Sequence, residues 1–241
     1  AFVQPACGIV AVPKVFTDYE ALGNAVGEGK LDVALLPPFA FVRAEGKGKI
    51  EPLFKVIRNG QPTYRALLFG NARTPVKSLV DFAKARPMKV AWVDSSSATG
   101  YLLPKARLLG KGINPAQAFS DQNFLNSHDA VCNAVATEQA DLGATFTDDP
   151  VTAKSTAITG CKAALGAGVS KLTIVAASEA IPNDALVVRP GFDAALKAKL
   201  SEAAKKADKK VLNDAFLAEG ITASAATDYA PVRAAIDSFK R

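Results

Sequence analysis

Apolar and polar residues alternate along this chain in short blocks that predict strands and helices in turn. Short runs rich in valine, leucine and isoleucine predict strands, and longer stretches with apolar residues three and four positions apart predict helices. We expect strands at Gly8–Phe16, Leu31–Leu36, Ile50–Ile57, Thr63–Phe69, Lys89–Val93, Asp141–Phe146, Lys171–Ala177 and Ala185–Val188. Helices are expected at Asp18–Gly27, Phe39–Ala44, Lys77–Arg86, Tyr101–Leu109, Ser127–Gln139, Phe192–Ala207, Lys209–Ala218 and Tyr229–Lys240. This alternation predicts an α/β fold.

Two breaks in this pattern suggest that the chain crosses between two lobes. Gly70–Pro75 follows a strand, and Ser178–Asp184 joins two strands through a proline. We therefore expect one lobe to contain residues 1–70 and 178–241, and the other to contain residues 71–177. Two lobes leave a cleft between them, which is the usual place for a small ligand.

A hydroxyl-rich turn is the strongest chemical signal in the chain. The apolar run Met88–Val93 leads into Asp94–Gly100, which reads Asp-Ser-Ser-Ser-Ala-Thr-Gly, and a helical stretch follows from Tyr101. Backbone N–H groups at a helix start have no partner inside the helix, and the helix dipole is positive there. Small hydroxyl residues add further donors, so the turn suits a phosphate-like group. Taken alone, the same residues also fit a plain helix cap.

Composition narrows the function classes. The chain has 241 residues, 49% hydrophobic and 22% charged, with a net charge of +6 and 7% aromatic residues. The basic residues are spread out, and the densest run, Lys205–Lys210, contains an acid and fits a solvated helix face better than a nucleic-acid surface. No apolar run reaches the roughly 18 residues that span a membrane. The chain begins at Ala1, and a cleaved secretory signal is one explanation.

Neither the cysteines nor the single histidine form a metal-binding pattern. Cys7, Cys132 and Cys161 have no close pair spacing, and His128 stands at no ligand spacing from them. Cys132 falls in an apolar helical pattern and is expected to be a buried thiol. Cys7 and Cys161 could be free, or one pair could be bridged. The odd number leaves at least one thiol unpaired or bonded to another molecule.

Several runs, in this order along nearly the whole chain, resemble one protein family. The chain resembles the phosphonate-, phosphite- and phosphate-binding proteins of ABC importers, which are type II periplasmic solute-binding proteins. The matching runs are Asp18–Leu22, Leu31–Leu36, Ser97–Pro104, Ser127–Ala130, Ala140–Thr145, Ile181–Asp184 and Asp228–Arg233.

The resemblance implies a two-lobed α/β fold, each lobe a mixed sheet flanked by helices, with two hinge crossings. It also implies a monomeric periplasmic protein that captures a tetrahedral oxyanion for a membrane permease, with no cofactor, no metal and no catalysis. The family normally begins with one further strand and helix, and Ala1–Cys7 looks like the end of that helix. The first lobe is therefore expected to lack those two elements.

The resemblance assigns the anion to the hydroxyl-rich turn and to the histidine. The turn Ser96–Thr99 would bind the phosphoryl oxygens, with hydroxyls from Ser97 and Thr99 and only the backbone amide from Ala98. His128 would donate to the anion, although a histidine at a helix start can also be satisfied by the backbone. Pro104 conflicts with a regular helix from Thr99, so we expect a kinked first turn or a later helix start.

Three further residues match family positions that line the ligand. Tyr64 would approach from the other lobe, and Asp184 would accept a hydrogen bond from a protonated ligand oxygen, which selects anions that carry a hydrogen. Asp148 matches an acid that holds the ammonium of an aminoalkylphosphonate in some members, and a loop cap is an equal alternative. The residues leave open which of phosphate, phosphite, methylphosphonate or an aminoalkylphosphonate binds.

Two other functions compete with transport. The same fold could sense an oxyanion for a membrane histidine kinase. Ser97, His128 and Asp184 could also form a hydrolase triad, but the Gly-x-Ser-x-Gly elbow typical of serine hydrolases is absent.

Overall fold

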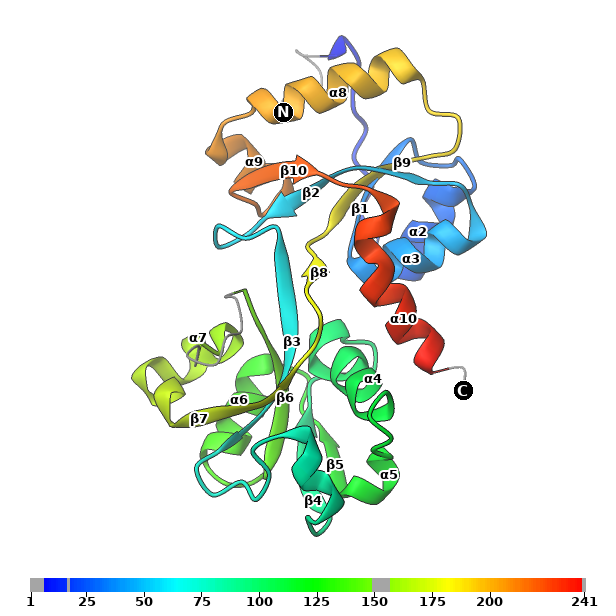
Figure 1. Ribbon diagram of the computed structural model, residues 1–241. Helices are drawn as coiled ribbons and strands as arrows, with labels where there is room; N and C mark the ends of the chain where they lie inside the picture. The colour runs from blue at the N-terminus through cyan, green and yellow to red at the C-terminus, as the bar shows by residue number, and fades with distance from the viewer. Residues whose placement is uncertain (1–6, 17, 149–156, 240–241) are drawn as a thin grey trace. The chain divides into compact units, whose positions relative to one another are not determined.

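The computed structural model describes residues 7–16, 18–148 and 157–239, and Figure 1 shows their helices and strands. Contacts within the chain define two compact units. Unit 1 is Ala1–Thr63 with Ile181–Arg233, and unit 2 is Tyr64–Ala180 with Ala234–Arg241. The chain therefore passes between units after Thr63, after Ala180 and again after Arg233, while Gly70–Pro75 lies inside unit 2.

Unit 1 is built on an antiparallel sheet. Its strands are β1 (Val33–Leu36), β2 (Glu51–Ile57), β9 (Ala185–Val188) and β10 (Gly220–Ala223), in the order β1-β9-β2-β10, and β8 (Ile181–Pro182) precedes β9. Its helices are α2 (Tyr19–Gly27), α3 (Pro38–Lys47), α8 (Ala194–Lys206) and α9 (Lys209–Phe216), and the short turn η5 (Ala226–Tyr229) leads into α10 (Ala230–Ser238). The predicted start of the first of these helices is confirmed, because the Asp18 carboxylate accepts from the Glu20 amide at 2.5 Å.

Helices cover both faces of the unit 1 sheet. Leu36 and Val187 pack with Val26 of α2 and Phe41 of α3 on one face. On the other face, Phe54 and Leu186 pack with Leu200 and Ala204 of α8 and with Cys7. Figure 1 shows α8 on one side of this sheet and α2 and α3 on the other. The alternation of strand side chains between two apolar layers explains why short strands suffice here.

Unit 2 is built on a mixed sheet, in the order β5-β4-β6-β3-β7. Its strands are β3 (Thr63–Asn71), β4 (Met88–Trp92), β5 (Phe119–Phe124), β6 (Leu142–Thr147) and β7 (Leu172–Ala177). Its helices and helical turns are η1 (Leu79–Ala83), η2 (Ala98–Leu102), α4 (Leu103–Leu109), α5 (Pro115–Ala118), α6 (His128–Ala136), η3 (Thr159–Cys161), α7 (Lys162–Leu165) and η4 (Gly166–Lys171). Strand β4 runs parallel to both β5 and β6, whereas β3 runs antiparallel to β6 and β7.

Two apolar layers hold the unit 2 sheet between its helices. Leu67 and Val93 pack with Val131 of α6 on one face, and Leu68 and Trp92 pack with Leu108 of α4 on the other. The expected mixed sheet is therefore present in unit 2, whereas all described strand pairs in the unit 1 sheet are antiparallel.

The strand predicted at Gly8–Phe16 is wrong, because the described part of this segment forms no strand. Val10, Val12 and Val15 are 73%, 77% and 96% exposed. Valine favours a strand only where a neighbouring strand completes the hydrogen bonds and covers the side chains, and Pro13 removes one donor. The segment Ala1–Cys7 was expected to be the end of a further helix. Except for Cys7, it lies outside the described residues.

The helix predicted at Lys77–Arg86 is also wrong in extent, because only the 3₁₀ turn η1 forms there. The Asp81 carboxylate accepts hydrogen bonds from the backbone amides of Lys77 and Ser78. Val80 is exposed, so no apolar stripe supports a longer helix. The kinked start expected near Pro104 is confirmed: η2 is a π-helical turn, and α4 begins at Leu103 with Pro104 in its first turn.

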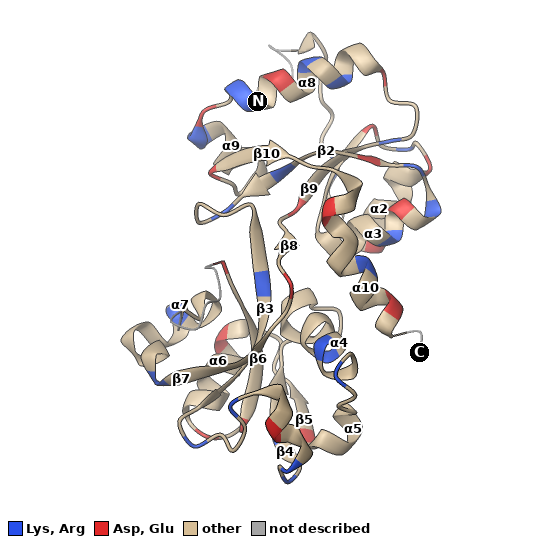
Figure 2. Ribbon diagram, viewed as in Figure 1, with Lys and Arg blue, Asp and Glu red and all other residues tan. Residues whose placement is uncertain are grey.

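The expectation of a Cys132 thiol is wrong, because Cys132 and Cys161 form a disulfide whose Cα atoms lie 5.5 Å apart. Cys7 is the free thiol and is buried. Charged residues of both signs are interspersed, as α8 illustrates in Figure 2. Lys205 pairs with Glu202 on this helix. Among the described residues, no helix is both long and apolar enough to cross a membrane.

Candidate functional site

Three parallel strands of unit 2 end at the same edge of the sheet, and the expected anion-binding residues follow them. Strand β4 leads into the hydroxyl-rich turn, β5 leads into α6, and β6 leads to Asp148. Backbone hydrogen bonds join the first two connections: Leu125 donates to Trp92 and Asn126 donates to Val93, at 2.9 and 2.7 Å. Ligands of α/β sheets bind at the carboxyl ends of strands, so this edge is the candidate site.

Ser97 caps the helical segment that follows the turn. Its Oγ accepts a hydrogen bond from the Gly100 amide at 3.0 Å. Because the oxygen is used as an acceptor, the hydroxyl hydrogen remains available to a ligand. The amides of Ala98 and Thr99, the first two residues of η2, have no partner inside the helix. This end of the segment therefore presents two amides and one hydroxyl.

Gly100 lets the turn close against β4. Its carbonyl accepts from the Val93 amide at 3.1 Å. A Cβ on Gly100 would lie 2.4 Å from the Val93 side chain and 2.8 Å from Ser97 Oγ. Only glycine fits this approach, so the sequence Thr-Gly in the turn has a steric reason.

The other two hydroxyls of the turn differ in availability. Thr99 is 6% exposed, and its hydroxyl has no hydrogen-bond partner among the described residues. Ser96 instead donates to the Asp94 carboxylate from both its hydroxyl and its amide, at 2.5 and 2.8 Å. The Ser96 hydroxyl and then its amide hold the pKa of Asp94 below its usual range. Ser96 therefore has to leave Asp94 before it can donate to an anion.

His128 is the first residue of α6, and its ring lies against β6. The helix is capped by Ser127, whose Oγ accepts from the Ala130 amide at 3.1 Å. The ring Nδ1 lies 3.0 Å from Oγ1 of Thr145, and the ring edge faces Phe146 with centroids 5.1 Å apart. Burial lowers the pKa of His128, with Asp129 acting in the opposite direction, so the imidazole is neutral at pH 7.

The contact with Thr145 determines which ring nitrogen of the neutral imidazole carries the proton. When the Thr145 hydroxyl donates to Nδ1, Nε2 carries the proton and can donate to an anion. Thr145 is fully buried, so its hydroxyl is held in place by packing. This pair provides a neutral hydrogen-bond donor at the same sheet edge as the turn.

Two other expected residues lie at this edge. Asp148 directly follows β6; its amide donates to Thr159 Oγ1 at 3.0 Å, and that hydroxyl lies 3.3 Å from its carboxylate. Asp148 is thus bonded to Thr159 of η3, which fits the alternative that it has a local structural role. Tyr64 was expected in the other lobe, but it is the first residue of unit 2 and is half-buried near the start of β3.

Arg65 is a candidate that the sequence reasoning missed. It pairs with Thr147 across β3 and β6, and it lies on the face that carries Leu67 and α6. Its Nη1 donates to the Ser178 carbonyl at 2.8 Å, and among the described residues it has no carboxylate partner. A lone arginine opening the apolar run Ala66–Phe69 was the available signal.

Asp184 belongs to unit 1, where Arg58 holds it. Arg58 Nη2 lies 2.8 Å from Asp184 Oδ2, and the same guanidinium donates to the Phe216 and Leu217 carbonyls at the end of α9. The Asp184 carboxylate therefore has a fixed cation beside it, a partner that the sequence reasoning did not foresee.

The contacts do not form a hydrolase triad. Ser97 bonds the Gly100 amide and His128 bonds Thr145, so the described residues place no base on the Ser97 hydroxyl. Asp184 pairs with Arg58. A nucleophilic serine needs a base within hydrogen-bond reach and an acid that orients the base. The described residues also contain no cluster of three His, Cys, Asp or Glu side chains that could hold a metal ion.

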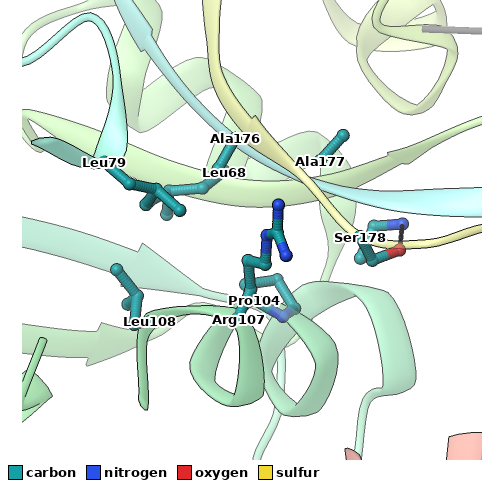
Figure 3. Close-up of a pocket in the computed structure, with 9 residues that line it drawn as sticks. Leu68, Leu79, Pro104, Arg107, Leu108, Ala176, Ala177 and Ser178 are labelled. Atoms are coloured by element: carbon teal, nitrogen blue, oxygen red, sulfur yellow. Dashed lines mark hydrogen bonds between the residues drawn. The ribbon is translucent and has the colours of Figure 1, made fainter. Parts of the chain in front are cut away.

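A hollow of unit 2, drawn in Figure 3, lies on the α4 face of the sheet, apart from the candidate site. Arg107 of α4 reaches into it, and Ser178 lies at its margin. Its remaining walls are apolar side chains of Ala66, Leu68, Leu79, Pro104, Leu108, Ala176 and Ala177. None of the expected site residues lines it, and its walls offer few hydrogen-bond donors to an oxyanion.

Comparison with known proteins identifies a family that this chain matches. The model of a family described as the phosphonate-binding periplasmic substrate-binding protein of ABC transporters matches residues 1–229. A phosphate-import protein, PhnD, of Mycolicibacterium smegmatis is 32% identical over 142 residues, covering 54% of this chain. The chain spans 43% of the length of that curated relative.

Solved structures share the fold. A binding protein component of an ABC phosphonate transporter from Pseudomonas aeruginosa matches with a TM-score of 0.67 and 24% identity, over 99% of this chain and 78% of its own. PhnD1 from Prochlorococcus marinus, solved in complex with methylphosphonate, matches with a TM-score of 0.66 and 15% identity, over 99% and 89%. The expected α/β fold of type II periplasmic binding proteins, with two sheets flanked by helices, is confirmed.

Proposed function

This chain belongs to the family of periplasmic phosphonate-binding proteins of ABC transporters, and on that premise we propose that it captures a tetrahedral phosphorus oxyanion for a membrane permease. The capture involves binding and release without catalysis. The ligand class is phosphate, phosphite or a small phosphonate. This agrees with the names of two similar proteins, one a phosphate importer and the other solved with methylphosphonate.

One observation carries the proposal: donors from two helix starts converge on the edge where β4, β5 and β6 end. The amides of Ala98 and Thr99, the hydroxyls of Ser97 and Thr99, and the His128 imidazole are the donors. Neutral donors at a helix start bind an oxyanion without a buried counter-charge of their own. Arg65 adds a positive charge nearby on β3, which suits a doubly charged phosphorus oxyanion.

We assign narrower roles to the remaining expected residues. Tyr64 lines the ligand, and Asp148, which bonds Thr159, is the carboxylate that the ammonium of an aminoalkylphosphonate would meet. Asp184 accepts from a protonated ligand oxygen, with Arg58 fixing its orientation. Ser96 contributes last, because Asp94 already holds it.

Calorimetric titration tests the proposal. The parent chain is titrated with phosphate, phosphite and methylphosphonate, and then Ser97→Ala and His128→Ala are titrated with whichever anion binds. Each variant should weaken binding about tenfold or more, because each removes a hydrogen bond to a charged group. Ser95→Ala is the matched control, since Ser95 is an exposed neighbour in the same turn and should bind as the parent does.

Two results would refute the assignment. A folded parent chain that binds none of the three anions removes the proposed function. Unchanged affinity in both Ser97→Ala and His128→Ala removes the proposed site. Hydrolysis of a phosphate ester that disappears in Ser97→Ala would instead support an enzyme.

A further inference from the structure

The Cys132–Cys161 disulfide lies directly behind the His128 donor. Cys132 stands one helical turn after His128 on α6, so both side chains are on the same side of the helix. Cys161 ends η3, and both cysteines are fully buried in the apolar layer between α6 and the sheet. The disulfide therefore joins the helix that presents His128 to a separate segment of the chain.

That segment, η3, presses against the end of β6. A Cβ on Gly160 would lie 2.2 Å from Oγ1 of Thr145 and 2.8 Å from the Phe146 ring, the two residues that contact His128. The preceding residue, Thr159, bonds Asp148. Successive residues of η3 thus contact the end of β6, and then Cys161 bonds α6.

These contacts form a closed path. It runs from His128 to Thr145, from Thr145 to Gly160, along η3 to Cys161, through the disulfide to Cys132, and back along α6 to His128. Each step is a hydrogen bond, a close contact or a covalent bond. A ring of this kind fixes the distance between α6 and β6 on which the contact between His128 and Thr145 depends.

We propose that the Cys132–Cys161 disulfide is a positioning element of the anion site, holding His128 against Thr145 so that the imidazole is fixed as a donor. The proposal rests on the proposed function for its ligand. Without the disulfide, η3 can withdraw from β6, Thr145 loses its backing, and the His128 ring gains solvent and rotational freedom.

The test replaces the disulfide by Cys132→Ala with Cys161→Ala and measures two properties. Calorimetry with phosphate or methylphosphonate should give about tenfold weaker binding, the cost of one lost hydrogen bond to charge. Proton NMR of the imidazole, which has a single signal set because the chain has one histidine, should show its pKa rising toward the ordinary value of about 6.5. Cys7→Ala, in unit 1, is the matched control and should change neither property.

Gly160→Ala provides a second variant that keeps the disulfide. Its new methyl group would push Thr145 away from His128, so it should produce the same two changes. If the double cysteine variant does not fold, Gly160→Ala decides the question. Unchanged anion affinity together with an unchanged His128 pKa in a folded variant would overturn the proposal.

The two measurements also separate this proposal from the proposed function. A parent chain that binds no phosphorus oxyanion refutes the function, yet the His128 pKa still reports whether the disulfide positions the imidazole. A parent that binds, with folded variants that bind equally well and keep the His128 pKa, supports the function and removes the positioning role.

Discussion

Neighbouring residues of the hydroxyl-rich turn perform different tasks. Ser96 holds Asp94, Ser97 accepts from Gly100, and the Thr99 hydroxyl has no partner among the described residues. The sequence predicts an anion cradle at this turn, but which hydroxyl is already bonded and which is available depends on the backbone geometry. The steric need for Gly100 likewise emerges only from its contact with Val93.

Gly100→Ala should weaken both anion binding and the stability of the folded chain. The added methyl group meets Val93 and Ser97, so we expect anion binding to weaken at least about tenfold and the chain to lose about 1–3 kcal/mol of unfolding free energy. Calorimetry and urea denaturation measure the two effects. Gly46→Ala is the control: it has open space on helix α3 and should be neutral or stabilise by up to about 1 kcal/mol. Equal behaviour of the two variants would contradict the steric role of Gly100.

His128 should make stability depend on pH. Burial lowers its pKa in the folded chain, so the unfolded chain binds the proton more readily. The free energy of unfolding should therefore fall as pH drops below about 6.5, by at most about 1.4 kcal/mol per pH unit, until the folded pKa is passed. Urea denaturation from pH 7.5 to 5 measures this slope. His128→Gln should flatten it in that range, and a slope that survives the substitution would assign it to other groups.

At the scale of elements, the sequence predicts the helices whose starts are marked by a capping residue. Asp18 marks the start of α2, and Ser127 marks the start of α6. Strand β5 was not predicted, because Ser120–Asn123 is polar; the strand lies at the sheet edge, where its side chains are exposed. The segment Gly8–Phe16 shows the converse error, since valine-rich composition cannot replace a strand partner.

The disulfide should contribute strongly to stability. It closes a loop across a separation of 29 residues, which corresponds to about 3.5 kcal/mol in the chain-entropy account. Cys132→Ala with Cys161→Ala should lower the free energy of unfolding by about that amount, as measured by urea denaturation. Cys7→Ala removes only a buried thiol and should cost about 1 kcal/mol. If both variants lose the same free energy, packing rather than the covalent link explains the effect.

At the scale of the whole molecule, the chain combines two units with separate cores. The α/β class follows from the sequence, whereas the passages after Thr63 and Ala180 differ from one expected crossing, Gly70–Pro75. That stretch looks like a linker because it contains glycine and proline. In the structure it is a tight turn instead, with Thr74 Oγ1 accepting from the Asn71 amide at 2.8 Å. Pairings distant in sequence, such as Arg58 with Asp184, are also invisible to local patterns.

Ligand binding should stabilise the whole chain. An anion that binds only the folded state adds about 2.7 kcal/mol at a hundred times its Kd, which raises Tm by about 5 °C for a chain of this size. Scanning calorimetry with and without phosphate or methylphosphonate measures the shift. Chloride at equal ionic strength is the control, and an identical shift with chloride would indicate a salt effect.

The placement of Trp92 gives the molecule an optical property of its own. It is the only tryptophan of the chain, it ends β4, and its ring packs edge-on against Tyr101 of η2 with centroids 5.4 Å apart. Its indole N–H donates to Gln122 on β5 at 3.1 Å. The fluorophore therefore touches the helical segment whose first turn is the proposed cradle, so its emission should change as an anion settles there. The native chain can then report its own occupancy without any attached dye.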